Sequence, residues 1–454
     1  MKKSAPILCM AVALATACSQ TPALTLTPAG NAGSTAPRPT STKAAVSELG
    51  VDESKLKDVS IEVWHPWFGV EADFFETLVE QFNHENEWGI EVNPTGQINF
   101  SYLFENVNSS LPTPRRPNLV VALPEHAAEW HVEQLVADLT PYVDDPKFGI
   151  DPSDFPLVFW NQDIVPDARI AFPAQRTARF LLWNESWAED LGFDAPPVSE
   201  KEFQDQACAA HKSMISDASP ENDGRGGWLV DTESMTAYSW LLSFEGGVLE
   251  SNDYRFLTPN NISAFKYIRT LAEAGCAWQK GNSTPTSESF ANREALLITA
   301  SLEDLPGQSR AIASTGSTDV WKAVPFPGEE VLAVYGSSYV ILKAAPEKQL
   351  ASWLFISWLT DPSQDARWVE ATHLFPLRTS SLSYLEDYRK SHPQWAEVVD
   401  MLPSGELQPE LASWRLVKIM LGDGFSHMFK ANVPSGQVAA ILAQMESTSR
   451  DLSK

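Results

Sequence analysis

The stretch VSIEVW at residues 59–64 alternates apolar and polar side chains, the pattern of a strand with one buried face. Apolar residues at helical spacing follow between residues 74 and 82, and GIEV at 89–92 is typical of a second strand. The sequence NLVVAL at 118–123 is a continuous apolar run, as expected of a strand buried on both faces. Further helices are expected after the second and third strands. This alternation predicts a mainly parallel sheet covered by helices, and therefore an α/β fold.

The length of the chain exceeds what one hydrophobic core can hold. It has 454 residues, 43% of them hydrophobic, whereas single cores stop growing beyond roughly 250–300 residues. Helical spacing predicts helices over 261–274 and 347–360, and Asp361-Pro362 is a typical helix start. We therefore expect two α/β lobes and a mainly helical C-terminal third.

The N-terminus reads MKKSAPILCMAVALATACSQ over residues 1–20. Its apolar part, residues 5–14, is shorter than the roughly 20 residues that a membrane span needs, so an export signal over 1–17 is expected. The sequence ATAC at 15–18 resembles the lipobox of bacterial lipoproteins, which implies lipidation of Cys18. An ordinary cleavable signal with an incidental cysteine is the alternative.

Residues 18–50 are rich in Ser, Thr, Ala and Pro and hold few large apolar side chains. Such a segment buries too little apolar surface to offset its ordering entropy. We predict a flexible linker between the lipid anchor and the folded part.

The charge balance argues against a nucleic-acid partner. The chain has 59 acidic and 33 basic residues, a formal net charge of -26, and no basic run. A surface of this kind repels phosphate backbones and anionic lipid. Contact with the membrane is therefore expected through the lipid anchor only.

Two cysteines, Cys208 and Cys276, remain after removal of the signal with Cys9 and lipidation of Cys18. Two leftover thiols in an exported protein form a natural disulfide pair. The alternative is two buried free cysteines.

Eight distinct segments follow one another along the chain: IEVWHPW at 61–67, PNLVVALPE at 117–125, AFPAQRTARFLLWN at 171–184, FANREALLITA at 290–300, WKAVPFPG at 321–328, YGSSYVIL at 335–342, the tryptophan-rich 353–368, and LFPLR at 374–378. Together, and behind a lipobox, they resemble the family 1 extracellular solute-binding proteins, the group that includes the maltose- and glycerol-3-phosphate-binding proteins.

The resemblance implies a two-lobe periplasmic-binding-protein-like fold of type II, each lobe a sheet flanked by helices, with the solute in the cleft between the lobes. The N-terminal lobe is expected to comprise 59–173 and 300–335, and the C-terminal lobe 174–299 and 336–454. Closure of the lobes around a solute is the motion known for such proteins.

The resemblance also implies a function without catalysis. The chain is expected to be a monomeric, exported lipoprotein that binds a carbohydrate or sugar-like solute and delivers it to the permease of an ABC importer, with no cofactor.

Sugars offer apolar faces to aromatic rings and hydroxyl groups to polar side chains. Trp64 lies at the C-terminal end of the first expected strand and Glu125 follows the strand that ends at Leu123, which is the edge where open α/β sheets bind ligands. Core packing of Trp64 and a helix N-terminal role of Glu125 are the alternatives. Further candidates that follow a strand, lie at an expected chain crossing or match a family segment are Gln97, Thr177, Trp240, Gly246, Tyr335, Gly336, Ser337 and Arg378.

Two of these candidates have explicit structural alternatives. Gly246 belongs to a Gly-Gly pair that is also a plain helix stop. Arg378 matches a family position whose guanidinium can reach the cleft, and the alternative is a structural ion pair with one of the many carboxylates.

An exported hydrolase of glycosidase type is the main competing function. The chain has no G-x-S-x-G, H-E-x-x-H or P-loop motif, yet two carboxylates can meet from anywhere in a chain. A sugar phosphate or other non-sugar solute is a second alternative, because Arg176, Arg179 and Arg378 can make a local positive site. No metal site is expected, since the nearest histidine pair, His126 and His131, lies off one helical face.

Overall fold

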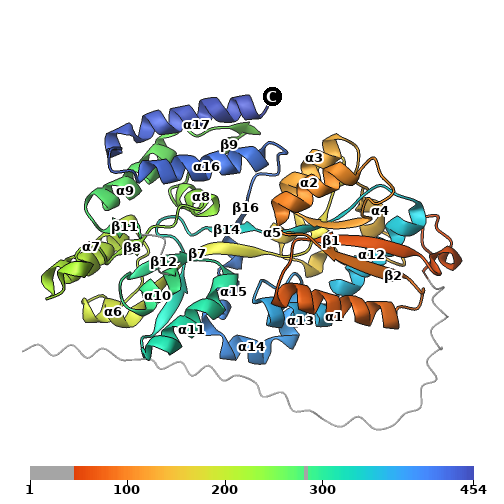
Figure 1. Cartoon of the computed structure of the whole chain (residues 1–454), viewed down its shortest axis with the longest axis horizontal. Coiled ribbons are helices and arrows are strands. Elements are labelled where there is room, and N and C mark those ends of the chain that lie inside the picture. The colour runs from red at the N-terminus through yellow and green to blue at the C-terminus, as the bar shows by residue number, and fades with distance from the viewer. Residues whose placement is uncertain (1–44, 281–284) are drawn as a thin grey trace, which may run out of the picture. The chain divides into compact units, whose positions relative to one another are not determined.

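The computed structural model describes residues 45–280 and 285–454, and Val46–Lys454 form one compact unit. The predicted signal 1–17, the lipidation site Cys18 and most of the linker 18–50 lie outside the described residues. Within the described part, two large sheets, one of five strands and one of seven, organise the chain (Figure 1).

The first sheet has the strand order β2-β1-β3-β15-β6. Its strands are β1 (Ser60–His65), β2 (Glu91–Gly96), β3 (Leu119–Ala122), β6 (Phe172–Pro173) and β15 (Ser338–Ile341). β1 pairs in parallel with β2 and β3, as the sequence predicts, whereas β15 runs antiparallel to β3 and β6. The sheet is therefore mixed.

Helices cover both faces of the first sheet. Its helices include α1 (Val70–Glu85), α2 (Phe100–Ser110) and α3 (Pro124–Val132). Figure 1 shows α1 on one side of β1 and α2 and α3 on the other. α1 buries Phe75, Leu78, Val79 and Phe82, the spacing from which the helix is predicted.

The second sheet has the order β11-β8-β12-β7-β14-β16, with β13 also paired to β7. Its strands are β7 (Thr177–Asn184), β8 (Trp228–Leu229), β11 (Ala277–Trp278), β12 (Leu297–Ala300), β13 (Trp321–Val324), β14 (Leu332–Tyr335) and β16 (Gly405–Leu407). β8, β11 and β12 are mutually parallel, and the long strand β7 runs antiparallel to β12, β13 and β14.

The helices of the second half of the fold are α6 (Glu185–Asp190), α7 (Glu200–Ser216), α8 (Ser234–Ser243), α9 (Pro259–Glu273), α10 (Thr286–Ala291), α11 (Leu305–Thr315), α16 (Trp414–Met428) and α17 (Val438–Leu452). The remaining elements are α4 (Thr140–Val143), α5 (Leu157–Trp160), α12 (Pro346–Leu359), α13 (Pro362–Thr372), α14 (Glu386–Ser391), α15 (Pro393–Asp400) and the hairpins β4–β5 (Ile164–Val165, Ala168–Arg169) and β9–β10 (Leu249–Glu250, Asp253–Tyr254). Most of the chain after Pro346 is helical, as predicted.

Local sequence signals set several helix boundaries. The side chain of Asp361 accepts a hydrogen bond from the Ser363 backbone at 3.0 Å, and Pro362 occupies the first turn of α13, which confirms the predicted start. Thr258 caps α9 in the same way, ahead of Pro259. These caps satisfy backbone N–H groups that a helix leaves unpaired at its beginning.

The assignment of two segments to the lobes is wrong. Residues 300–335 were expected in the N-terminal lobe, but β13 and β14 pair with β7 in the second sheet. Residues 336–454 were expected in the C-terminal lobe, but β15 pairs with β3, and α12 contacts β1 and β15. The chain crosses between the two sheets after Tyr335, as predicted, but it passes from the second sheet to the first. The long strand β7 holds β12, β13 and β14 as partners, so residues 300–335 stay with the second sheet.

Residues 405–454 match the expectation, since β16, α16 and α17 belong with the second sheet. We refer below to the first sheet with α1, α2, α3, α12 and α13 as the first lobe, and to the second sheet with α6–α11, α16 and α17 as the second lobe.

The predicted disulfide is present. Cys208 on α7 is bonded to Cys276, which precedes β11, with a Cα–Cα distance of 4.5 Å. The bond ties a helix of the second lobe to the edge of its sheet. Over residues 45–280 and 285–454, no helix combines the length and the apolar character needed to cross a membrane.

Candidate functional site

A cavity of about 780 Å³ lies at the C-terminal ends of three neighbouring parallel strands, β8, β11 and β12. Open α/β sheets bind their ligands at this edge, and the volume falls within the roughly 300–1,000 Å³ of small-molecule sites. β7 and α11 complete the wall. The polar lining residues are Arg179, Asp231, Thr232, Glu233, Gln279, Lys280, Thr286, Ser287, Thr299, Glu303, Asp304, Gln308 and Arg310.

Arg179 on β7 lies between two carboxylates of this cavity. Its guanidinium nitrogens are 3.8 Å from Asp231 and 3.9 Å from Asp304, both longer than a hydrogen bond. Burial lowers the pKa of Arg179, but the charges of Tyr335 and the neighbouring acids outweigh it and raise the pKa. Arg179 therefore stays charged and keeps N–H groups without close acceptors.

The carboxylate of Glu303 is held at the cavity by Thr177. The Thr177 hydroxyl donates to Glu303 at 2.8 Å and accepts the Leu302 backbone N–H at 3.2 Å. Thr177, a predicted ligand contact, is only 5% exposed. Its position assigns it the role of orienting Glu303.

Glu71 of the first lobe, in the first turn of α1, does not line this cavity, but its charge interacts with that of Glu303. Gln175, between β6 and β7, donates to Glu71 at 3.2 Å. Burial raises the pKa of Glu71, the hydrogen bond from Gln175 opposes this, and the charge of Glu303 raises it further, for a net upward shift. Two carboxylates from different lobes thus repel each other at the edge of the cavity.

The predicted contacts Gly336 and Ser337 build the chain crossing itself. A Cβ at Gly336, where φ is 157°, would lie 2.0 Å from the Gln175 carbonyl oxygen, so two backbones approach too closely for any side chain. Ser337 is 1% exposed, and its carbonyl accepts the N–H groups of Ala174 and Gln175 at 3.0 Å. The close approach that Gly336 permits is therefore between two backbone segments of the crossing.

Tyr335, at the same crossing, is half-buried at the end of β14. Burial raises its pKa, which keeps the phenol protonated, and the charge of Arg179 only partly offsets this effect. Tyr335 is thus brought next to Arg179.

Arg176, a candidate for an anionic solute, does not reach the cavity. It is fully buried and forms an ion pair with Asp163 at 3.0 Å. Its guanidinium also donates to the Ser338 hydroxyl at 3.1 Å and to the Ser337 carbonyl. Arg176 therefore holds the crossing together.

Trp64 lies near the C-terminal end of β1 and Gln97 directly follows β2, but neither lines the described cavity. Trp64 is half-buried against the apolar cluster that includes residues of α2 and α3. The side chain of Gln97 accepts from Asn106 at 2.7 Å. Trp64 therefore packs against the core, which was the alternative to a contact with the solute.

Glu125 joins the two lobes. It is fully buried in the first turn of α3 and forms an ion pair with Lys418 of α16. Burial would raise the pKa of Glu125, but the charge of Lys418 outweighs it and the net shift is downward. Beside it, Arg415 of α16 is 3.2 Å from Glu129 of α3. These pairs connect the lobes at α3 and α16.

Trp240 and Gly246 are structural, which corrects their predicted contact with solute. Trp240 is fully buried, with ring centroids 5.3 Å from Trp228 and 5.1 Å from Phe326. A Cβ at Gly246 would lie 2.2 Å from the Asn261 side-chain oxygen. The aromatic-rich segment belongs to the core because α8 packs against both the sheet and α16.

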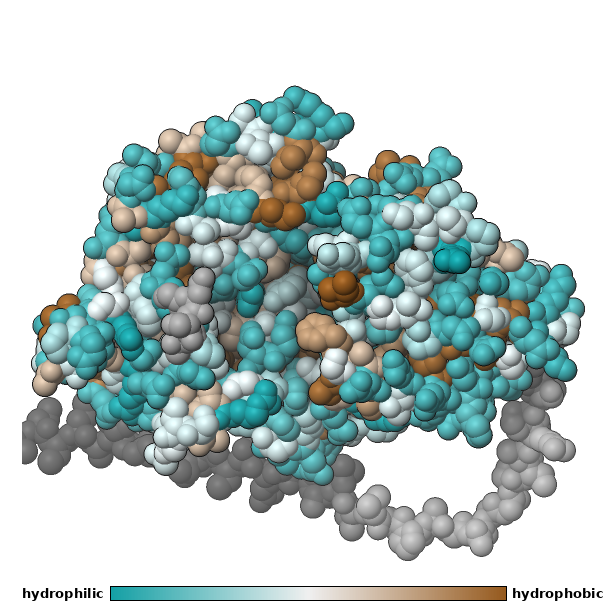
Figure 2. Space-filling model, in the orientation of Figure 1, coloured by the Kyte–Doolittle hydropathy of each residue, from teal (hydrophilic) through white to brown (hydrophobic). Residues whose placement is uncertain are grey.

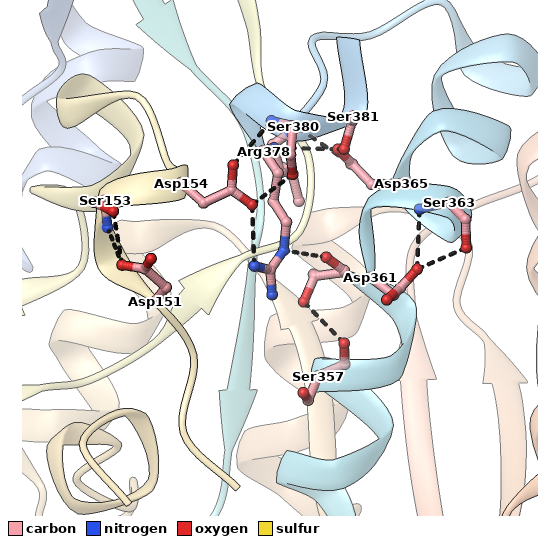
Figure 3. A network of polar contacts seen from close by, with 12 residues as sticks. Asp151, Ser153, Asp154, Ser357, Asp361, Ser363, Asp365, Arg378, Ser380 and Ser381 are labelled. Carbon is pink, nitrogen blue, oxygen red and sulfur yellow. Dashed lines mark hydrogen bonds and ion pairs between the residues drawn. The ribbon is translucent and has the colours of Figure 1, made fainter. Parts of the chain in front are cut away.

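Arg378 also has the structural role that was its alternative (Figure 3). Its guanidinium lies 3.3 Å from Asp154, donates to the Thr360 carbonyl and stacks 4.8 Å from the ring centre of Phe155. It borders a separate cavity of about 620 Å³ that does not include the acidic residues above. Arg378 does not line the 780 Å³ cavity.

The acidic cavity residues were missed by sequence analysis. Asp231 and Glu233 follow β8, and Glu303 and Asp304 follow β12. β8 has only two residues, too few for a periodic pattern. The apolar run before Glu303 offered a signal, since residues 296–300 read LLITA.

Over residues 45–280 and 285–454, no group of three or more His, Cys, Asp or Glu side chains suits a metal ion. Figure 2 shows that hydrophilic residues predominate on the visible face, which is hollowed near the middle of the view.

A family model described as bacterial extracellular solute-binding protein matches residues 77–398. Among solved structures, the sugar-binding protein MalE of Xanthomonas citri aligns with a TM-score of 0.75 and 18% identity, covering 87% of this chain and 97% of that one. The cyclic alpha-maltosyl-1,6-maltose binding protein of Arthrobacter globiformis gives 0.72 and 16%, covering 86% and 98%.

The UgpB protein of Mycobacterium tuberculosis, in complex with glycerophosphocholine, gives a TM-score of 0.71 and 16% identity, again covering 86% and 98%. At these identities the likeness shows the fold, and it confirms the predicted periplasmic-binding-protein-like architecture. A search of curated protein sequences finds no match.

Proposed function

Because the chain belongs to the bacterial extracellular solute-binding proteins, a non-catalytic family whose members serve ABC transporters outside the cytoplasm, we propose that its solute is a carbohydrate or sugar-like molecule bound at the 780 Å³ cavity. The family excludes the hydrolase alternative. The solute itself is the proposal.

The observation that carries the proposal is the polar lining at the C-terminal ends of β8, β11 and β12. Hydroxyl groups of a sugar both donate and accept, so they pair with carboxylates and with an arginine at once. Asp231, Glu303 and Arg179 offer this mixture within one cavity. Glu71 of the first lobe, whose charge interacts with that of Glu303, could reach a bound solute when the lobes close over it.

A thermal-shift screen of the full chain tests this function. A ligand that binds only the native state raises the unfolding midpoint. The panel comprises neutral sugars, amino sugars, polyols, sugar phosphates, amino acids and divalent metals. A shift with a sugar class supports the proposal, whereas shifts confined to amino acids or metals contradict it.

A sugar phosphate is the second candidate, favoured by Arg179 in the cavity wall. The two carboxylates at 3.8 and 3.9 Å from its guanidinium weigh against a phosphate at this place. Tighter binding of a sugar phosphate than of the unphosphorylated sugar would favour this second candidate.

We further propose that Cys18 carries a lipid anchor and that a membrane permease receives the solute. Tethering raises the effective concentration of the binding protein near its permease. Cys18→Ser is expected to release the protein from isolated membranes into the soluble fraction. If the Cys18→Ser protein stays with the membranes, the anchor proposal fails.

A further inference from the structure

The lining of the 780 Å³ cavity differs from that of an ordinary small-molecule site. Such sites are mostly apolar and aromatic, with a few polar groups that fix orientation. Among the described residues, this lining holds no aromatic ring. Its carboxylates are Asp231, Glu233, Glu303 and Asp304. Stacking of a sugar face is therefore not the main source of affinity, and charge and hydrogen bonds must supply it.

The cavity also offers more acceptors than its own donors satisfy. Gln308 is 1% exposed, and its amide donates to the Ser287 carbonyl at 3.1 Å, but its side-chain oxygen has no hydrogen-bond partner among the described residues. A buried acceptor without a donor is unfavourable, so a donor from the solute would be stabilising there. The carboxylates add further acceptor positions, because an ionised carboxylate only accepts.

The positively charged side chains of the lining either have acidic neighbours or are exposed to solvent. Arg179 faces both Asp231 and Asp304. The charge of Lys280 interacts with Glu288 and Glu294, outside the four carboxylates above. Arg310 is exposed to solvent. Among the described residues Glu303 therefore has no direct ion pair, although the charge of Arg179 interacts with it at longer range.

Glu71 strengthens the negative field at this edge. It comes from the first lobe, and its charge and that of Glu303 oppose each other. A cation between two carboxylates relieves their repulsion and lets both stay ionised. Closure of the lobes, which brings such groups together, would then be favoured by a positively charged solute.

We propose that the solute is a polyhydroxylated cation, such as an amino sugar, whose ammonium group binds beside Glu303 and whose hydroxyl groups meet the remaining carboxylates and Gln308. This inference rests on the proposed carbohydrate function and narrows it. An ammonium group brings three donors and a positive charge, which matches an acceptor-rich, acidic cavity without aromatic rings.

Calorimetric titration of the full chain with matched pairs of sugars tests the inference. Within each pair, every sugar unit of one member has an amino group in place of one hydroxyl of the other, as in glucosamine against glucose and the β-1,4-linked glucosamine disaccharide against cellobiose. For the best-bound pair we expect the aminated member to bind at least about tenfold tighter at low salt, with the preference reduced at high salt because screening weakens the charge interaction.

Glu303→Gln keeps the acceptor for Thr177 and removes the charge, so it should bring the preference close to unity. Glu133→Gln, an exposed residue at the end of α3, makes the same charge change away from the cavity and should leave the preference intact. Equal or tighter binding of the neutral member, or a preference unchanged in Glu303→Gln, overturns the inference while leaving the carbohydrate function in place. If neither neutral nor aminated sugars bind and another class does, the carbohydrate proposal itself fails.

Discussion

Two arginines three positions apart, Arg176 and Arg179, lie in different environments. Arg176 is fully buried, has an ion pair at 3.0 Å and donates hydrogen bonds to the crossing strand. Arg179 lies in the wall of the cavity, and its nearest carboxylates are 3.8 and 3.9 Å away. Saturated contacts mark a residue that holds the fold, whereas long contacts beside a cavity leave a residue able to bind something else.

The largest effect that this comparison predicts is on stability at the crossing. Arg176→Gln removes one partner of a buried ion pair and leaves Asp163, itself 2% exposed, without its counter-charge. Losses of this kind cost about 3–5 kcal/mol. Chemical denaturation should show that loss in the free energy of unfolding. A change below about 1 kcal/mol would mean that the crossing does not depend on this pair.

Arg179→Gln is the matched change in the cavity and should separate binding from stability. If Arg179 contacts the solute, its loss should weaken the affinity by about tenfold to a hundredfold, or roughly 1.4–2.7 kcal/mol. The free energy of unfolding should fall by less than in Arg176→Gln, because the attraction to Asp231 and Asp304 is lost but no close hydrogen bond is. Calorimetry and denaturation of the same preparation give both values. Unchanged affinity would remove Arg179 from the proposed site.

Arg378→Ala extends the comparison to a third arginine, one that sequence analysis placed at the solute. The substitution loses the contact with Asp154 and the hydrogen bond to the Thr360 carbonyl (Figure 3). We expect a loss of about 2 kcal/mol in unfolding free energy, since bonds to charged groups contribute about 1.5–3 kcal/mol each.

Solute affinity should stay within about twofold of the parent for Arg378→Ala, a change well under 1 kcal/mol. A clear loss of affinity with unchanged stability would restore the role that the sequence suggested for Arg378.

The sequence predicted the fold better than the site, for a physical reason. Regular apolar patterns identify α1, β1 and β3, whose spacing reflects burial on one or both faces. The disulfide follows from the small number of cysteines. In contrast, β8 and β11 have two residues each and no periodicity, so Asp231 and Glu233 could not be placed at a strand end.

The wrong site predictions share a cause. Tryptophan and arginine side chains occur both in ligand sites and in protein cores. The burial of Trp240 and Arg378 gives both a structural role. Burial depends on which segments meet in space, and the chain crosses between the sheets in the direction opposite to the one predicted after Tyr335. Gly336 and Ser337, which follow Tyr335, were therefore predicted to contact the solute, whereas they hold the crossing in place.

The smallest predicted effect concerns pH at the crossing. Burial raises the pKa of Glu410 to about 8, and the charge of Asp163 adds to this, although Arg176 and Arg169 oppose it. An unfolded glutamate titrates near 4.3. Between pH 4.3 and 8 the folded state therefore holds a proton that the unfolded state has released. The free energy of unfolding consequently falls as the pH rises through this window.

Glu410→Gln cannot lose this proton, so its free energy of unfolding should fall less between pH 5 and pH 9 than that of the parent. The difference should be on the order of 1 kcal/mol. Burial also raises the pKa of Asp365 to about 6, which lowers the free energy of unfolding with rising pH in the same way. Because this effect is the same in the parent and in Glu410→Gln, it cancels in the comparison. Denaturation at several pH values measures the difference. Parallel stability profiles would show that Glu410 is already ionised in the folded state, with Arg176 and Arg169 as its partners, and the crossing would then be balanced in charge throughout this range.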